Sequence, residues 1–301
     1  MEKMIKDYSL SPEAMIMITG SSIGAQKKYY ADGFWYKQNH VGYEGISEHL
    51  VSKVLACSNI PEYVDYEQCK INGKQGCRSA NFLHEKESFI SLQRLYDTYH
   101  GGQLSEKIRL LDSISDRVSF VVDFVFRVTE LDIREQLGRV ATLDMLVLNT
   151  DRHFNNIGII ADTLNAEYRN APVFDNGNAL LSNIGEYPFD VSIEENIAKV
   201  VGQPFAANLE RQAMELGFGL KINYEKLQNI LRKEPNSRAL ETLQMQLDKY
   251  EMLLKDNSIL CNISNKESLL EKLSIKKNII ESGRSESTEN ILHEKNDKDF
   301  R

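Results

Sequence analysis

The sequence predicts an α+β fold in two lobes, a small β-rich lobe with one helix followed by a larger, mostly helical lobe. Short strand-like runs separated by turns fill about the first 80 residues, and helical periodicity dominates from residue 86 onward. A chain of 301 residues with 42% apolar content is long enough to bury a core in each lobe. We expect lobes at residues 1–85 and 86–256 and a tail at 257–301.

The small lobe is predicted from three strand-like runs, at residues 15–19, 27–31 and 34–38. Asp32 and Gly33 separate the last two runs, and an Asp-Gly pair between aromatic runs is a strong signal for a β-hairpin. Apolar residues then recur at helical spacing over residues 46–57. Residues 63–71 indicate a further strand, which glycine-containing turns follow.

The large lobe should begin with four helices, at residues 86–99, 103–113, 116–130 and 133–148. Asp132 with Glu135 indicates a capping box at the start of the fourth helix. Its apolar residues Leu137, Val140, Leu143 and Leu146 to Leu148 must be buried. Two short strands are expected at residues 157–161 and 171–175. Further helices follow at residues 192–256 and 267–280, and the polar residues 282–301 are expected to be disordered.

Composition and charge exclude several classes of protein. No apolar run reaches the roughly 18 residues that a membrane span needs, and the first ten residues lack a signal peptide, so we expect no membrane partner and a cytoplasmic location. The net charge of −8 argues against nucleic-acid binding, which needs many uncompensated cations. The four cysteines have neither metal-ligand spacing nor the density of a disulfide framework.

The polar motif NTDRHFNN, followed by FDNG, predicts the chemistry of the large lobe. Phosphoryl transfer needs a carboxylate to orient the attacking hydroxyl and oxygen ligands for Mg²⁺. Asp151 and Asn156 are separated like the Asp and Asn of a kinase catalytic loop, and Asp175 begins a turn where such enzymes hold a metal. We therefore expect Asp151 to act as base, Asn156 and Asp175 to bind Mg²⁺, and Arg152 and His153 to brace the loop.

The small lobe offers residues suited to phosphate binding. The loop GSSIGAQKK at residues 20–28 has two glycines that let backbone N–H groups approach phosphate oxygens. Lys37 ends the third strand and should pair with Glu48 on the following helix, with Glu44 as the alternative partner. The complete set of candidate nucleotide-binding residues is Gly20, Ser21, Ser22, Gly24, Ala25, Gln26, Lys28, Lys37, Glu48 and His153.

Three segments together resemble the HipA-like serine/threonine kinases: GAQxK at residues 24–28, NTDRHFNN at 149–156 and APVFDNG at 171–177. The resemblance covers roughly residues 15–180 and is strongest to the compact CtkA-like members. It implies a two-lobed protein-kinase-like fold, ATP and Mg²⁺, and a protein substrate with a Ser or Thr acceptor. It also implies autophosphorylation in the glycine loop, where Ser21 is the best positional match and Ser22 the next.

Other interpretations stay open at this point. The form DRHxxN also resembles the catalytic loop of phosphoinositide kinases, so a lipid or a small molecule is an alternative acceptor, and a catalytically inactive nucleotide-binding module is another. A metal-dependent hydrolase is disfavoured because the chain lacks a ligand set such as HExxH. An antitoxin partner is also open, because about 19 residues precede the glycine loop where full-length HipA toxins carry a further domain.

Overall fold

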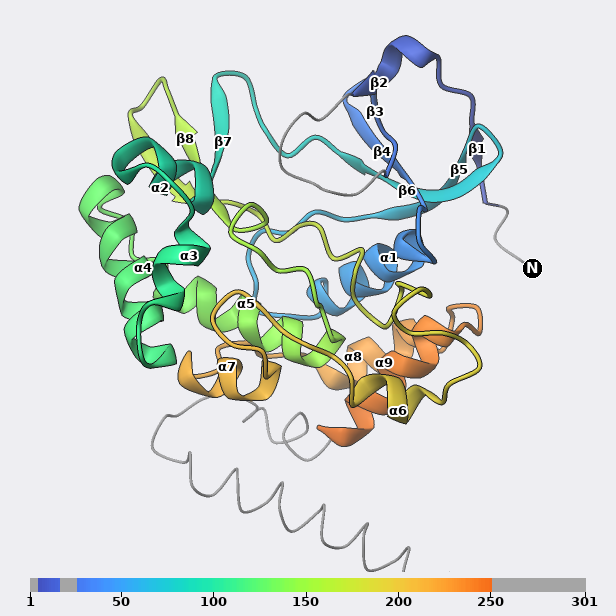
Figure 1. The fold of residues 1–301 in the computed structure, drawn as a ribbon. Coiled ribbons are helices and arrows are strands. Elements are labelled where there is room, and N and C mark those ends of the chain that lie inside the picture. Colours follow the sequence, from blue (N-terminus) through green and yellow to red (C-terminus); the bar gives the residue numbers. More distant parts are fainter. Residues whose placement is uncertain (1–4, 17–25, 251–301) are drawn as a thin grey trace, which may run out of the picture. The chain divides into compact units, whose positions relative to one another are not determined.

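Most strands lie before residue 92 and most helices after it in the computed structural model, which describes residues 5–16 and 26–250 (Figure 1). All of these residues belong to the compact unit Met1–Cys261. The α+β class and the two predicted lobes are confirmed, whereas the lobe limits at residues 85 and 256 stay predictions. The helix predicted at 267–280 and the polar end at 282–301 lie outside the described residues. Within the described ranges, no helix is long and apolar enough to cross a membrane.

Six strands form the sheet of the small lobe: β1 (Asp7–Tyr8), β2 (Met15–Ile16), β3 (Lys28–Ala31), β4 (Phe34–Gln38), β5 (Glu67–Ile71) and β6 (Lys74–Ala80). Their order is β1-β5-β6-β4-β3-β2, and only β1 and β5 pair in parallel. The predicted Asp-Gly hairpin joins β3 to β4, with φ of 50° at Asp32 and 78° at Gly33, the left-handed values of a type I′ turn. Successive side chains of a strand point to opposite faces, so Lys37 and Tyr36 face different sides of the sheet.

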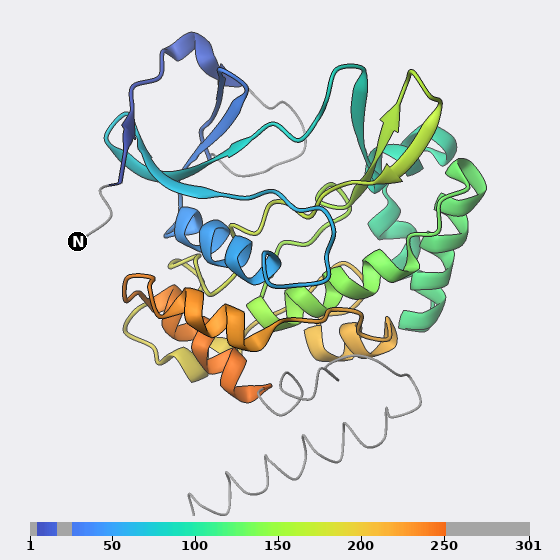
Figure 2. The same ribbon diagram turned by 180° about the vertical axis from the view of Figure 1, so that it is seen from behind.

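Helix α1 (Glu44–Leu55) lies against one face of this sheet (Figure 2). It packs between strands β5 and β6 and helices α8 (Tyr224–Leu231) and α9 (Arg238–Lys249). The approach is close at Gly45, where an added Cβ would lie 2.6 Å from the backbone of Gly76. Glu48 of this helix is buried and contacts Lys37 of β4.

A second, three-stranded antiparallel sheet has the order β7-β8-β9 and consists of β7 (Glu87–Ser91), β8 (Gly158–Asp162) and β9 (Glu167–Asn170). The helix predicted from residue 86 is therefore wrong over its first turn and a half. Phe89 and Ile90 pair with β8 instead, and Ser91 caps the helix that follows by accepting a hydrogen bond from the N–H of Arg94. The strand predicted at residues 171–175 is also wrong, because this segment makes only an isolated bridge between Val173 and Tyr63.

The large lobe is built mainly of helices: α2 (Leu92–His100), α3 (Leu104–Arg109), α4 (Ile114–Thr129), α5 (Arg134–Val147), α6 (Ile193–Ile197), α7 (Leu209–Glu215), α8 and α9. Helix α5 is buried from Gln136 to Val147 apart from Arg139, as predicted. The predicted capping box is wrong, because Asp132 accepts from the N–H of Arg134 while Glu135 pairs with Arg139. At its other end, Leu148 adopts a left-handed conformation (φ 56°) that turns the chain into the NTDRHFNN motif.

Candidate active site

A buried ion pair between Asp144 and Arg152 fixes the loop that carries the motif. Arg152 donates hydrogen bonds of 3.0–3.2 Å to the Asp144 carboxylate at the end of α5, and both side chains are at most 1% exposed. The same guanidinium donates to the carbonyl of Phe174 at 2.7 Å and to the side-chain oxygen of Asn176. Arg152 therefore joins α5, its own loop and the FDNG turn, which is the bracing predicted for it.

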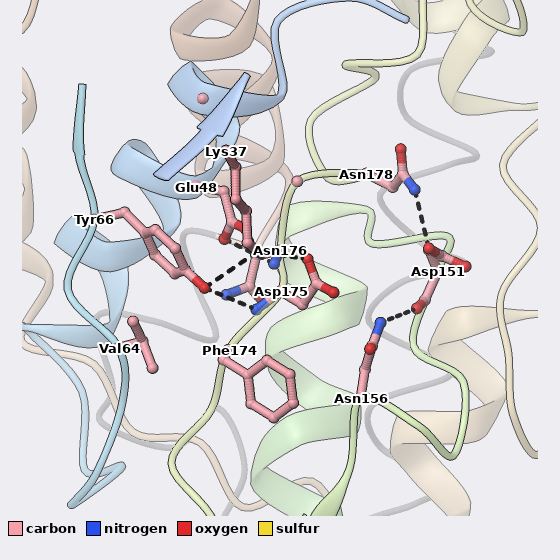
Figure 3. A network of polar contacts seen from close by, with 12 residues as sticks. Lys37, Glu48, Val64, Tyr66, Asp151, Asn156, Phe174, Asp175, Asn176 and Asn178 are labelled. Carbon is pink, nitrogen blue, oxygen red and sulfur yellow. Dashed lines mark hydrogen bonds and ion pairs between the residues drawn. The ribbon is translucent and has the colours of Figure 1, made fainter. Parts of the chain in front are cut away.

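The Asp151 carboxylate is held through both of its oxygens. Figure 3 shows the hydrogen bonds that Asn178 and Asn156 donate to Asp151. Asn178 Nδ2 donates to Oδ2 at 3.0 Å, and Gln203 Nε2 lies 3.3 Å from Oδ1 while it also donates to the carbonyl of Thr150 at 2.8 Å. Asn156 Nδ2 donates to the backbone carbonyl of Asp151 at 3.0 Å, and His153 Nε2 is 3.8 Å from Asp151 Oδ1. The side chain of Asp151 is 44% exposed, so an acceptor can reach it.

Lys37 lies at the centre of a second cluster of charges. Its Nζ is 2.8 Å from Glu48 Oε1, 2.8 Å from Asp175 Oδ1 and 3.3 Å from the hydroxyl of Tyr66. The other oxygen of Glu48 accepts the N–H of Asn176 at 2.8 Å. The predicted pairing of Lys37 with Glu48 is present, whereas Glu44 accepts the backbone N–H groups of His40 and Val41 instead.

The charges of this cluster set its protonation. Burial would lower the pKa of Lys37, but the carboxylates of Asp175 and Glu48 raise it well above its usual range. Burial would likewise raise the pKa of Asp175, yet Lys37, Lys28 and Arg152 together hold it well below its ordinary value. For Glu48, burial prevails over Lys37 and raises the pKa. Asp175 thus stays ionised and suited to bind a cation.

Lys28 brings a second cation to the same face. It lies directly opposite Lys37 in the β3–β4 pair, where side chains of paired residues share one side of the sheet. Burial and the neighbouring charge of Lys37 lower the pKa of Lys28. Gln26, two residues earlier, is half-buried, while Gly20, Ser21, Ser22, Gly24 and Ala25 lie outside the described residues.

The oxygen donors at the site have the chemistry that Mg²⁺ requires. Asp175 offers a carboxylate that is 27% exposed, and Asn156 keeps its side-chain oxygen because its Nδ2 is bonded to Asp151. Mg²⁺ prefers such hard oxygen ligands and commonly completes its shell with phosphate oxygens and water. Residues 5–16 and 26–250 contain no group of three or more His, Cys, Asp and Glu side chains placed to hold a metal ion.

Tyr66, Asn178 and Gln203 belong to the site but were not found from the sequence. Tyr66 places its hydroxyl 3.3 Å from Lys37 Nζ and 3.4 Å from the backbone N of Asp175. Figure 3 shows Tyr66, Lys37 and Glu48 on one side of Asp175, with Asp151 and Asn178 on the other. Only Asn178 had a nearby signal, since it directly follows FDNG; Tyr66 and Gln203 lie in segments without a motif.

A kinase-like fold is indicated by the two lobes, by the Lys37–Glu48 pair and by the two polar loops. Comparison with known proteins supports this fold. No family model and no curated protein matches the sequence. The crystal structure of CtkA, a proinflammatory kinase of Helicobacter pylori, aligns with 84% of this chain and 96% of its own, with a TM-score of 0.59 and 15% identity. HipA of Shewanella oneidensis MR-1, solved with HipB and operator DNA, aligns with 83% of this chain and 68% of its own, with a TM-score of 0.46 and 10% identity.

The likeness to CtkA confirms the two-lobed kinase-like fold that the sequence predicted. It agrees with the resemblance of the three sequence segments to the CtkA-like members of the HipA-like group. At 15% identity the likeness concerns the fold, and the activity has to be argued from the residues of this chain.

Proposed function

We propose that this chain is an ATP- and Mg²⁺-dependent kinase of the HipA-like type that phosphorylates a Ser or Thr hydroxyl of a protein. The observation that carries this proposal is Lys37 bridging Glu48 and Asp175, next to the doubly held carboxylate of Asp151, on a kinase-like fold. A cation, a metal-binding carboxylate and a hydroxyl-orienting carboxylate are the parts that phosphoryl transfer needs.

Glu48 and Lys37 would position the nucleotide phosphates. Glu48 is 1% exposed and bonded to both Lys37 and the Asn176 backbone, so it holds the ammonium group at the floor of the site. Lys28 adds charge from the neighbouring strand. Asp175 and Asn156 would hold the magnesium ion, which would neutralise charge on the transferring phosphate.

Asp151 would orient the acceptor and take its proton. The acceptor oxygen attacks the γ-phosphorus, a new O–P bond forms, the bond from that phosphorus to the bridging oxygen of ADP breaks, and the hydroxyl proton passes to the Asp151 carboxylate. Asn178 and Gln203 keep that carboxylate oriented because each donates to one of its oxygens. Autophosphorylation at Ser21 or Ser22 is part of the proposal and rests on the sequence resemblance. A phosphate there would add about −1.5 to −2 charges to the loop that is predicted to bind the nucleotide phosphates, and it would oppose ATP binding.

The proposal is tested by incubating the wild type and the Asp151→Asn and Asp175→Asn variants with labelled ATP and Mg²⁺, each alone and with a generic protein substrate. The measured quantity is the label transferred to protein. We expect each variant to lose phosphoryl transfer by about 10²–10⁴-fold, the typical contribution of such groups. Asp112→Asn is the matched control, because Asp112 is exposed in the connection between α3 and α4 and should leave transfer unchanged.

Equal labelling by all four proteins would contradict the assignment of the site. Label on phosphoinositide vesicles but never on protein would support the lipid-kinase alternative. ATP binding without any transfer would support an inactive nucleotide-binding module.

A further inference from the structure

A cavity of about 490 Å³ opens beside Asp151. Nine residues line it, among them Asp151, Asn178, Glu186, Lys199, Val201 and Gln203. Lys37, Asp175 and Asn156 do not line it, so the cavity adjoins the site on the side of Asp151 that is not occupied by the phosphate-facing cluster. Its volume is within the range of about 300–1,000 Å³ that is usual for ligand sites.

Two of the three charged side chains that line this cavity, Glu186 and Lys199, are unpaired within residues 5–16 and 26–250. Glu186 and Lys199 are exposed, and neither side chain makes a hydrogen bond or ion pair with another described residue. The Asp151 carboxylate accepts hydrogen bonds from the amide groups of Asn178 and Gln203, and His153 Nε2 lies 3.8 Å from its Oδ1. With two carboxylates and one ammonium, the wall has a net charge of −1, so its field favours a cation beside the acceptor hydroxyl.

An anionic acceptor fits this wall poorly. A phosphoinositide headgroup or another phosphorylated molecule needs several cations, whereas Lys199 is the one cation among the nine lining residues. Asp151 and Glu186 would also repel its phosphates. Val201, which is 59% exposed at the cavity, instead offers an apolar surface to a neighbouring side chain of a peptide.

We propose that this cavity is the acceptor site and that it takes a Ser- or Thr-bearing peptide segment with a Lys or Arg close to the acceptor residue. This proposal rests on the proposed kinase function and adds the substrate class to it. Asp151 receives the hydroxyl proton, and Glu186 selects the basic side chain by direct charge pairing. Because Glu186 is exposed, the selection is modest in size and weakens as salt screens the pair.

Three synthetic serine peptides that differ only in one flanking residue, as Arg, Ala or Glu, test this proposal. The measured quantity is kcat/KM for each peptide with Mg-ATP at low ionic strength. We expect the wild type to favour the Arg peptide over the Ala peptide by about two- to fivefold. Glu186→Gln should bring this ratio to about one, and Glu186→Lys should shift the preference to the Glu peptide.

The matched control is Glu194→Gln, an exposed carboxylate in α6 that does not line the cavity. It should keep the wild-type ratio, and thermal unfolding checks that all variants are folded. An unchanged ratio in Glu186→Gln would overturn the proposal, as would transfer to phosphoinositide vesicles in place of peptides. Transfer to peptides or autophosphorylation without any charge preference would overturn the acceptor-site proposal and leave the proposed kinase function standing. If no phosphate were transferred from ATP to any acceptor, both the acceptor-site proposal and the proposed function would be overturned.

Discussion

Two clusters of opposite charges flank the FDNG turn, and they differ in how fully they are closed. Asp144 and Arg152 are at most 1% exposed, and the guanidinium donates to a carboxylate, a backbone carbonyl and a side-chain amide. In the other cluster one ammonium, Lys37, is shared by Glu48 and Asp175, and Asp175 is 27% exposed. We call the first cluster closed, because almost no solvent reaches either of its side chains, and the second open, because solvent reaches the Asp175 carboxylate.

This difference assigns separate tasks to the two clusters. A closed pair has no free bonding capacity for a ligand, and breaking it leaves an uncompensated buried charge. A cation shared between two carboxylates can give up one of them when phosphates arrive, while the other still holds it. The Asp144–Arg152 pair therefore holds the loop rigidly, whereas Lys37 in the other cluster can exchange one of its partners.

Removing Arg152 should produce the largest effect. Arg152→Met leaves Asp144 buried without its cation, and we expect the free energy of unfolding to fall by about 3–5 kcal/mol. Urea unfolding followed by circular dichroism measures the loss. The double variant Asp144→Leu/Arg152→Met should recover part of it, because the unpaired charge is gone. Additive losses from the two single substitutions would show that the pair is not coupled.

Neutralising the open cluster should affect catalysis more than folding. Glu48→Gln removes the carboxylate that holds Lys37, and we expect kcat/KM for Mg-ATP to fall about 10-fold to 100-fold, or about 1.4–2.7 kcal/mol. The unfolding free energy should change less than in Arg152→Met, because no buried charge loses all its partners: Lys37 keeps Asp175. A loss of stability as large as that of Arg152→Met would remove the distinction between the two clusters.

A substitution of Gln203 tests whether its amide orients the Asp151 carboxylate for catalysis. Gln203→Leu removes the amide that contacts Asp151 Oδ1, and we expect kcat to fall about three- to tenfold while the KM for ATP is unchanged. Gln203→Asn shortens the amide and serves as the conservative comparison. A change in the KM for ATP with kcat intact would contradict a role in orienting Asp151.

The smallest expected effect is the loss of unfolding free energy that follows when acid protonates Asp175. The pKa of Asp175 is lowered in the folded state, so its contribution to stability is complete above the ordinary carboxyl pKa and declines as the pH falls below it. Between about pH 5 and pH 3 this contribution should decrease by about 1 kcal/mol. Asp175→Asn should lose correspondingly less stability over that range, as measured by urea unfolding at each pH. Parallel curves for the two proteins would contradict the lowered pKa.

Local chemistry made part of the fold predictable. The hairpin at Asp32 and Gly33 follows from the residues of its own turn, and the burial of α5 follows from apolar residues within one helix. The sequence does not predict strand β7, because this strand is stabilised by pairing with β8, about 70 residues later, which no local pattern reveals. Residues 171–175 have the apolar composition of a strand, but Val173 makes only an isolated bridge with Tyr63, and residues 171–173 are buried without joining a ladder.

The candidate site shows the same limit. Asp151, Asn156 and Asp175 were selected because spacing within two short segments identifies them. Tyr66 and Gln203 act on partners 109 and 52 residues away, and their positions depend on the completed fold. Residues 20–25 of the glycine loop lie outside the described residues, so the predicted role of Ser21 remains a prediction.

Asn178 gives the site one more property, because it lies three residues after Asp175 and also holds Asp151. Its carbonyl accepts from Thr150, and its amide donates to the Asp151 carboxylate. Under the proposed function, an ion that moved Asp175 would act on the turn that orients Asp151, and an acceptor that moved Asp151 would act back on Asp175. Thermodynamic reciprocity would then require that nucleotide-metal binding and acceptor binding alter each other's affinity by the same factor.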